Sequence, residues 1–212
     1  MTVHRRTLMT GMGAMMVLSG CGALSALSDA TTALDAFELR APNLPQAGRM
    51  LQRGLSIEPP TASGALDVDR ILIKPNPVQS LYLPGARWSD NAPLMYQSVM
   101  LRAFEDTGAL SYVGRRPLGG AGDVALISEI TDFQAELAAD GDSAVTRIRL
   151  TARLVRETDA RVLARRSFQA VTPAESTDAL EIVQAFNAAS DAVLSDLVRW
   201  GLEAMGLRLP AA

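Results

Sequence analysis

The fold is decided by residues 124–170, which read VALISEITDFQAELAADGDSAVTRIRLTARLVRETDARVLARRSFQA. Apolar and polar residues alternate through most of this stretch, which is typical of strands with one buried face. The predicted buried side of the middle strand consists of Ile148, Leu150, Ala152 and Leu154. Turn signals at Asp140-Gly141 and at residues 157–159 separate the strands. We therefore predict three consecutive antiparallel strands, with a bulge near Thr131 where the apolar parity changes.

The third of these strands leads toward a long amphipathic helix. Its predicted inward residues are Val162, Ala164, Phe168 and Ala170. Asp178 is the predicted N-cap of the helix. The apolar stripe of the helix recurs at three- and four-residue steps and consists of Ile182, Phe186, Ala189, Val193, Leu197 and Trp200. Such a stripe indicates a helix packed on the sheet.

Upstream, shorter segments complete the sheet. Strands are predicted over residues 51–57, 68–73, 81–83 and 110–113, and Pro84-Gly85 is expected to stop the third. A shorter helix is predicted to start at Asn91 and Pro93 and to end at Thr107-Gly108. The predicted fold class is α+β: a single domain over residues 47–206, with a mostly antiparallel mixed sheet and two helices packed on one face.

The N-terminus carries an export signal. Arg5 and Arg6 precede a short apolar run over residues 8–18, and Leu18-Ser19-Gly20-Cys21 matches the bacterial lipobox. We expect residues 1–20 to be a signal peptide and to form a helix that packs on little of the domain. Cys21 is expected to receive the lipid, palmitate included, and residues 21–46 to form the lipidated N-terminus and a flexible tether. The alternative is an ordinary buried cysteine after a short helix.

Two further features of this segment bear on location and export. Gly22 stands where aspartate would retain a lipoprotein in the inner membrane, so the outer membrane is favoured. The resulting localisation is the cell envelope, with a lipid-anchored chain facing the periplasm. Arg5-Arg6 also faintly matches a twin-arginine signal, so the general and twin-arginine export routes both stay open.

Composition argues against several functional classes. The 212-residue chain has a formal charge of −3, and removal of Arg5 and Arg6 with residues 1–20 would make it −5, which does not favour nucleic-acid binding. Cys21 is the only cysteine and His4 the only histidine. Without the signal segment, a Ser-His-Asp triad and a histidine-ligated metal are excluded. We therefore expect no enzyme activity, catalytic residue, metal or cofactor.

Two surface features are candidates for partner binding. The segment from Tyr82 to Asp90 is predicted to be an exposed loop, and Tyr82, Arg87 and Trp88 are the residue types that dominate interface hot spots. Trp88 has an alternative role as a cap on the core. A second candidate is a basic stripe formed by Arg147, Arg149, Arg153, Arg161 and Arg165. The stripe is either a solvated face balanced by nearby acids or a contact for an acidic partner or anionic headgroups.

Four segments in order resemble one family. They are LDVDRILI (66–73), YLPGARWSD (82–90), FEDTG (104–108) and DFQAE (132–136). Together they resemble the ABC-type transport auxiliary lipoproteins, the PqiC-like proteins, over roughly residues 37–200 and behind the same kind of lipobox. The family more usually has Tyr-Tyr or Tyr-Arg where this chain has Tyr82-Leu83, so a role for the second residue is not carried over.

The resemblance implies a periplasm-facing subunit of a lipid-transport system. Its companions in such a system are a permease, an ATPase and a substrate-binding protein with a mammalian-cell-entry (MCE) domain. The implied role is to dock or bridge the MCE-domain protein to the outer membrane. The alternatives are a carrier lipoprotein that holds an acyl chain in its own cavity and a passive envelope lipoprotein. A large apolar cavity between sheet and helices would favour the carrier, and a filled core would favour docking.

Overall fold

A single mixed sheet organises the chain around β7 (Val124–Leu137). The computed structural model describes residues 33–117, 123–139 and 141–211. On one edge β7 pairs antiparallel with β8 (Ala144–Arg156), which pairs antiparallel with β9 (Arg161–Ala174). On the other edge it pairs in parallel with β2 (Leu51–Ile57), β3 (Thr61–Ala62) and β4 (Arg70–Asn76) in succession. Pro59-Pro60 separates β2 from β3, because proline has no N–H to donate to a ladder.

The remaining strands, β5, β1 and β6, extend the sheet beyond β4 and β2. β5 (Gln79–Trp88) pairs antiparallel with β4, and β1 (Asp35–Phe37) pairs in parallel with β5. β6 (Leu110–Gly114) pairs in parallel with β2. The two long antiparallel ladders, β7–β8 and β8–β9, dominate, so the fold is the predicted α+β arrangement with a mostly antiparallel mixed sheet.

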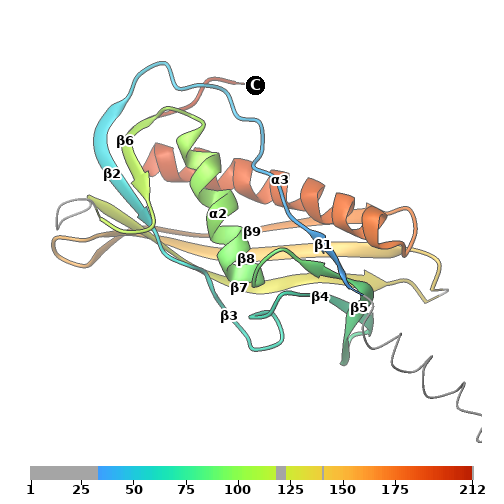
Figure 1. The fold of residues 1–212 in the computed structure, drawn as a ribbon. Coiled ribbons are helices and arrows are strands. Elements are labelled where there is room, and N and C mark those ends of the chain that lie inside the picture. The colour runs from blue at the N-terminus through green and yellow to red at the C-terminus, as the bar shows by residue number, and fades with distance from the viewer. Residues whose placement is uncertain (1–32, 118–122, 140, 212) are drawn as a thin grey trace, which may run out of the picture. The chain divides into compact units, whose positions relative to one another are not determined.

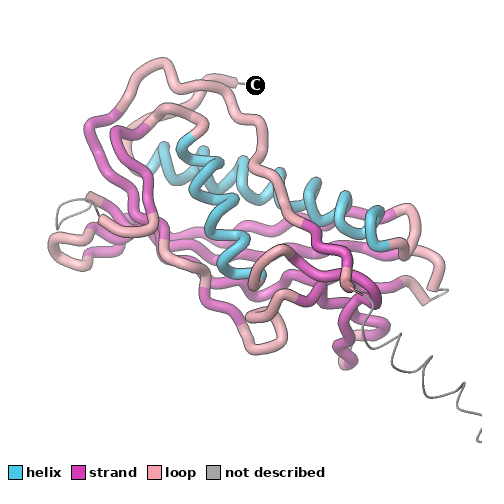
Figure 2. The backbone as a smooth tube through the Cα atoms, viewed as in Figure 1, coloured by secondary structure: helices cyan, strands magenta, loops and turns pink. Residues whose placement is uncertain are grey.

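Both helices of the described residues, α2 (Ala92–Glu105) and α3 (Ala179–Ala204), cover the same face of the sheet (Figures 1 and 2). Asn91 is the N-cap of α2, with proline in its first turn, and Asp178 is the N-cap of α3. Both starts agree with the prediction. Neither of these helices is long and apolar enough to cross a membrane.

Four aromatic side chains fill the space between the sheet and the helices. Phe133 of β7 lies with its ring centroid 5.5 Å from Tyr96 of α2 and 5.1 Å from Phe186 of α3. Trp88, at the end of β5, meets Phe186 edge-on at 5.2 Å and Phe133 at 5.6 Å. All four are fully or almost fully buried. The core therefore joins both helices to the sheet through one aromatic cluster.

The three long strands confirm the main part of the prediction. The register shifts between Ile130 and Asp132, which is the expected bulge. Ile148, Leu150, Ala152 and Leu154 are all fully buried. Gly141 lies in the β7–β8 hairpin with a φ of 79°, while Asp140 lies outside the described residues.

Two local predictions are wrong. Pro84-Gly85 does not end the third upstream strand, because β5 runs on to Trp88 through a bulge in which Gly85 adopts a φ of 71°. The segment from Tyr82 to Asp90 is therefore mostly strand, not loop. Val162 is 53% exposed instead of inward, because the register shifts between Leu154 and Val155 and reverses the parity of β9.

Part of the expected tether packs on the domain. β1 joins the sheet, and Leu39 and Leu44 are buried in the core. The backbone N–H of Arg40 donates to Oδ1 of Asn187 on α3 at 2.9 Å. Residues 35–46 thus belong to the domain in the structure. The expected signal peptide, its helix and Cys21 lie outside the described residues.

Candidate functional site

The face of the sheet opposite α2 and α3, called the outer face below, is where the described polar side chains meet. Its members on β7 and β8 are set by the ladder register, which puts Asp132 opposite Arg149, Gln134 opposite Arg147 and Glu129 opposite Thr151. Side chains on alternate positions face the helices and form the core. The outer face is therefore the side of the sheet that neither helix covers (Figure 1).

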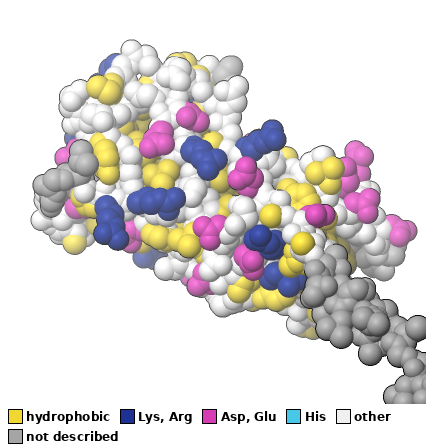
Figure 3. Space-filling view, viewed as in Figure 1, with side chains coloured by type: hydrophobic (Ala, Val, Ile, Leu, Met, Phe, Trp, Pro, Cys, Tyr) yellow, Lys and Arg dark blue, Asp and Glu magenta, His cyan; other side chains and the backbone are white. Residues whose placement is uncertain are grey.

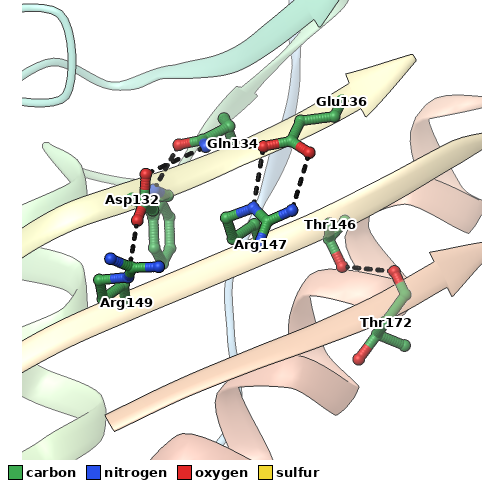
Figure 4. A network of polar contacts seen from close by, with 8 residues as sticks. Asp132, Gln134, Glu136, Thr146, Arg147, Arg149 and Thr172 are labelled. Carbon is green, nitrogen blue, oxygen red and sulfur yellow. Dashed lines mark hydrogen bonds and ion pairs between the residues drawn. The ribbon is translucent and has the colours of Figure 1, made fainter. Parts of the chain in front are cut away.

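A charged network crosses this face (Figure 4). Arg147 donates two hydrogen bonds to Glu136, Nε to Oε1 at 2.9 Å and Nη2 to Oε2 at 3.1 Å. Arg149 pairs with Asp132 at 3.1 Å. Between the two carboxylates lies Gln134, only 2% exposed, whose Nε2 donates to Asp132 at 3.3 Å and to Glu136 at 3.2 Å. The amide therefore links the two ion pairs into one unit.

This arrangement changes the acidity of Glu136. The hydrogen bond from Arg147 lowers the pKa of the Glu136 carboxyl, with Gln134 and the charges of Arg147 and Lys74 adding to the effect and partial burial opposing it. The same contact raises the pKa of Arg147. Both groups are therefore charged at neutral pH, and the network contributes little net charge of its own.

The network lines the bottom of a depression of about 670 Å³ beside the β4–β5 turn. Lys74, the only lysine of the chain, lines it with Pro75 and Pro77. A second depression of about 660 Å³ continues across β8 and β9, and Asp132 and Arg149 line both. The hollows lie on the outer face, not between the sheet and the helices.

The three residues predicted to bind a partner do not share one environment. Tyr82 is 38% exposed on the outer face, with the guanidinium of Arg70 5.5 Å from its ring centroid. Arg87 is partly exposed beside it and pairs with Asp69 at 3.7 Å. Trp88 points the other way and is 0% exposed. Its burial supports the alternative role as a cap on the core.

The basic stripe also divides. Arg147 and Arg149 are neutralised by the network. Arg153 and Arg165 lie directly opposite each other on β8 and β9, and Arg161 lies opposite Arg156 on the other face. On the side of the molecule seen in Figure 3, basic and acidic side chains are interspersed.

A separate polar group is buried under α3. Burial raises the pKa of Tyr96, with Asp191 adding to the shift and the Ser190 hydroxyl opposing it. Burial likewise raises the pKa of Asp191. Within the described ranges, no group of three or more His, Cys, Asp or Glu side chains is placed to hold a metal ion. Tyr96 and Ser190 are fully buried, whereas Asp191 is partly exposed.

Comparison with known proteins gives the family. The ABC-type transport auxiliary lipoprotein component family matches residues 37–198. The chain belongs to this family. The auxiliary lipoprotein also shares 30% identity and a TM-score of 0.70 with the crystal structure of a Xanthomonas campestris protein of the DUF330 family, covering 82% of this chain and 96% of that one.

Two further proteins are similar to this chain. A solved structure of an uncharacterised protein shares the fold, with a TM-score of 0.60 at 15% identity, over 77% of this chain and 99% of that chain. An uncharacterised Bradyrhizobium diazoefficiens protein is 30% identical over 168 residues. That match covers 77% of this chain and 44% of the relative, so the chain spans less than half of the relative's length. Family membership makes the chain a lipoprotein of the cell envelope.

Sequence reasoning missed the network of this auxiliary lipoprotein. Asp132, Gln134 and Glu136 alternate with the buried Phe133 and Ala135, which is the signal that places all three on the outer face. The arginines opposite them were recognised, but the pairing depends on the register after the bulge. That register is visible only in the structure.

Proposed function

We propose that this auxiliary lipoprotein is a periplasm-facing subunit of an MCE-type ABC lipid-transport system. In this role it docks or bridges the MCE-domain protein to the outer membrane, and through that protein it serves the permease and the ATPase. Family membership supports a transport role, and the remaining specifics rest on the resemblance and on the geometry of the outer face.

One observation carries the choice of docking over lipid carriage: the core is filled. An acyl chain held inside the domain would need a cavity of about 300 Å³ or more. Trp88, Tyr96, Phe133 and Phe186 occupy the space between sheet and helices, with ring centroids 5.1–5.6 Å apart. A carrier would have to separate these rings, whereas a docking subunit uses a rigid surface and needs no cavity.

The proposed contact surface is the outer face at β4 and β5, including Tyr82 and Arg87. Both are partly exposed, and aromatic and arginine side chains are enriched at the energetic centres of interfaces. Trp88 lies beneath them in the same strand and fixes the strand to the core. Its part in docking is to support the surface, not to contact the partner.

The test is capture of the co-encoded MCE-domain protein by the purified lipoprotein. Tyr82→Ala and Arg87→Ala are each expected to weaken capture about ten-fold or more while leaving the melting temperature unchanged. Arg102→Ala, an exposed arginine of α2 on the other side of the sheet, is the matched control and is expected to bind normally. Unchanged capture by both test variants would show that the interface lies on another surface. Failure of the wild-type chain to capture the MCE-domain protein would favour a passive envelope lipoprotein.

Lipid attachment at Cys21 belongs to the same proposal. The lipobox supports it, and Gly22 supports the outer membrane as the destination. Cells fed a fatty-acid analogue are expected to label the wild-type chain and not Cys21→Ala, and fractionation is expected to place the labelled chain in the outer membrane. Equal labelling of both chains would refute the assignment of Cys21.

A further inference from the structure

We propose that the outer face of the β8–β9 hairpin binds the phosphate of a phospholipid through Arg153 and Arg165. The starting observation is that these two arginines lie directly opposite each other across the ladder. Facing residues of an antiparallel pair hold their Cβ atoms about 5 Å apart, and like charges in that position repel. Both side chains are exposed, and within the part of the chain that the structure describes neither has an ion-pair partner.

The other arginines of the basic stripe on the outer face of β8 do have ion-pair partners. Arg147 and Arg149 stand on the same face of β8, but Glu136 and Asp132 neutralise them. The residue of β7 opposite Arg153 is Ile127, which offers no charge. Glu129, diagonally across the β7–β8 ladder, lines a small depression with Arg153 but makes no ion pair with it. The two facing guanidiniums therefore still repel each other, and an anion placed between them would relieve the repulsion.

The neighbouring rows of the ladder indicate which anion fits. Toward the β8–β9 turn, the next row on this face is apolar on β7, β8 and β9, where it consists of Ala125, Val155 and Val162. On β2 the row continues to Ser56, whose hydroxyl donates to Glu157 at 2.7 Å. On the other side, Thr151 and Ser167 form a hydroxyl pair with their Oγ atoms 2.9 Å apart. Successive rows on one face are about 7 Å apart, since each residue advances a strand by about 3.4 Å. The face thus runs from apolar to cationic to hydroxyl over about 14 Å.

A phospholipid has its own groups in that order. Its acyl chain begins beside the glycerol, the phosphate follows, and the polar headgroup lies beyond it. On this face Val162, which is 53% exposed, would contact the apolar end. The two arginines would bind the phosphate, and the hydroxyl pair with the second depression would receive the headgroup. Val162 is exposed through the same bulge that reverses the parity of β9.

Phosphate suits this pair better than a carboxylate. Each guanidinium presents a planar fork of donors that matches two oxygens. One carboxylate has two oxygens and is satisfied by one arginine, as Glu136 is by Arg147. A phosphate diester shares one negative charge between two non-bridging oxygens that point apart in a tetrahedral group, and its two ester oxygens are further, weaker acceptors, so two arginines and a nearby hydroxyl all find acceptors. A single phospholipid is therefore the proposed occupant, in preference to an acidic protein.

This site is distinct from the proposed docking surface on β4 and β5, and its test contains no MCE-domain protein. The chain over residues 21–212, carrying Cys21→Ala so that its own lipid does not attach it to a bilayer, contains every described residue. It is titrated calorimetrically with dihexanoyl phosphatidylglycerol below its micelle concentration. Inorganic phosphate in a second titration separates a lipid site from a site for the free anion.

Arg153→Gln and Arg165→Gln are each expected to weaken lipid binding about ten-fold, the effect of losing one charge-assisted bidentate contact. Arg161→Gln removes the same charge from the same hairpin at a register position on the other face, and it is expected to change binding less than about two-fold. Val162→Ser is expected to weaken the short-chain lipid and not inorganic phosphate, which should itself bind at least about ten-fold more weakly than the lipid.

Three outcomes would overturn the proposal. Equal losses in Arg161→Gln and Arg153→Gln would mean that only net charge matters. Equal affinity for phosphate and lipid would mean a site for the free anion. Normal binding by the Arg153→Gln, Arg165→Gln double variant would place the site elsewhere. Thermal melts check folding, and added lipid is expected to raise the Tm of the wild-type chain but not that of the double variant.

Discussion

Replacement of Trp88 by alanine separates a core role from an interface role. The side chain is 0% exposed and contacts the rings of Phe133 and Phe186. Alanine would leave a cavity at the point where β5 and α3 meet. If Trp88 were an interface anchor instead, its removal would weaken binding and leave the fold intact.

The magnitude follows from the burial. Truncation of a fully buried Phe or Trp to alanine typically costs about 3–5 kcal/mol. A domain of this size is stable by about 5–15 kcal/mol, so the variant would lose a large part of its stability. Each kcal/mol lowers the Tm of a domain of this length by about 2–4 °C. We therefore expect Trp88→Ala to melt about 10 °C or more below the wild-type chain.

Trp88→Phe provides a graded comparison. The indole Nε1 is buried with no hydrogen-bond partner among the described residues, so phenylalanine removes an unsatisfied donor and keeps a ring against Phe133 and Phe186. Its cost is expected to be about 1–2 kcal/mol, well below that of alanine. Leu180→Ala, at an exposed position of α3, is the control and should melt as the wild-type chain does. A Trp88→Ala melt within about 2 °C of wild type would refute the core role.

Three further changes test separate features by unfolding at two pH values or by thermal melting. Arg147 lowers the pKa of Glu136, so this pair stabilises the fold above the ordinary carboxyl pKa and loses that effect as the pH falls through the lowered value. Glu136→Gln should therefore cost about 0.5 kcal/mol near neutral pH and less in acid. Burial raises the pKa of Asp191, so its ionised form destabilises the fold above the ordinary pKa, and Asp191→Asn should raise the Tm near neutral pH but not in acid. Gly85→Ala should cost about 1–2 kcal/mol because φ is 71° there, whereas Gly48→Ala, whose added Cβ meets nothing within 4 Å, should cost little.

The elements with strong local signals were predictable from the sequence. Alternation around Leu150 and the three- and four-residue steps around Phe186 each depend on residues close in the chain. The caps at Asn91 and Asp178 are equally local. These signals predicted the three long strands, both helices and the class of the fold.

Long-range register was not predictable from the same signals. β7 pairs in turn with β2, β3 and β4, and no local pattern states where along β7 each of them begins. Pro84-Gly85 predicts a strand end because proline donates no hydrogen bond and glycine favours turns. In a bulge neither property breaks the strand, since the ladder is interrupted there in any case.

The bulges also decide how the outer face divides. The bulge between Ile130 and Asp132 shifts the parity of β7, and the acids that follow it share a face with Arg147 and Arg149 and form ion pairs with them. Before the bulge, Ile127 faces Arg153, and Glu129 on the same face makes no ion pair with Arg153. One half of the face therefore carries ion pairs that nearly neutralise each other, and this half attracts a partner only at contact distance. The other half keeps a positive charge whose field extends about 8–10 Å at physiological salt. A partner that contacts the first half must fit its shape, whereas an anion is attracted to the second half before contact. Because the two halves act through different forces, salt would weaken attraction to the Arg153 half while leaving the contact at Tyr82 nearly unchanged.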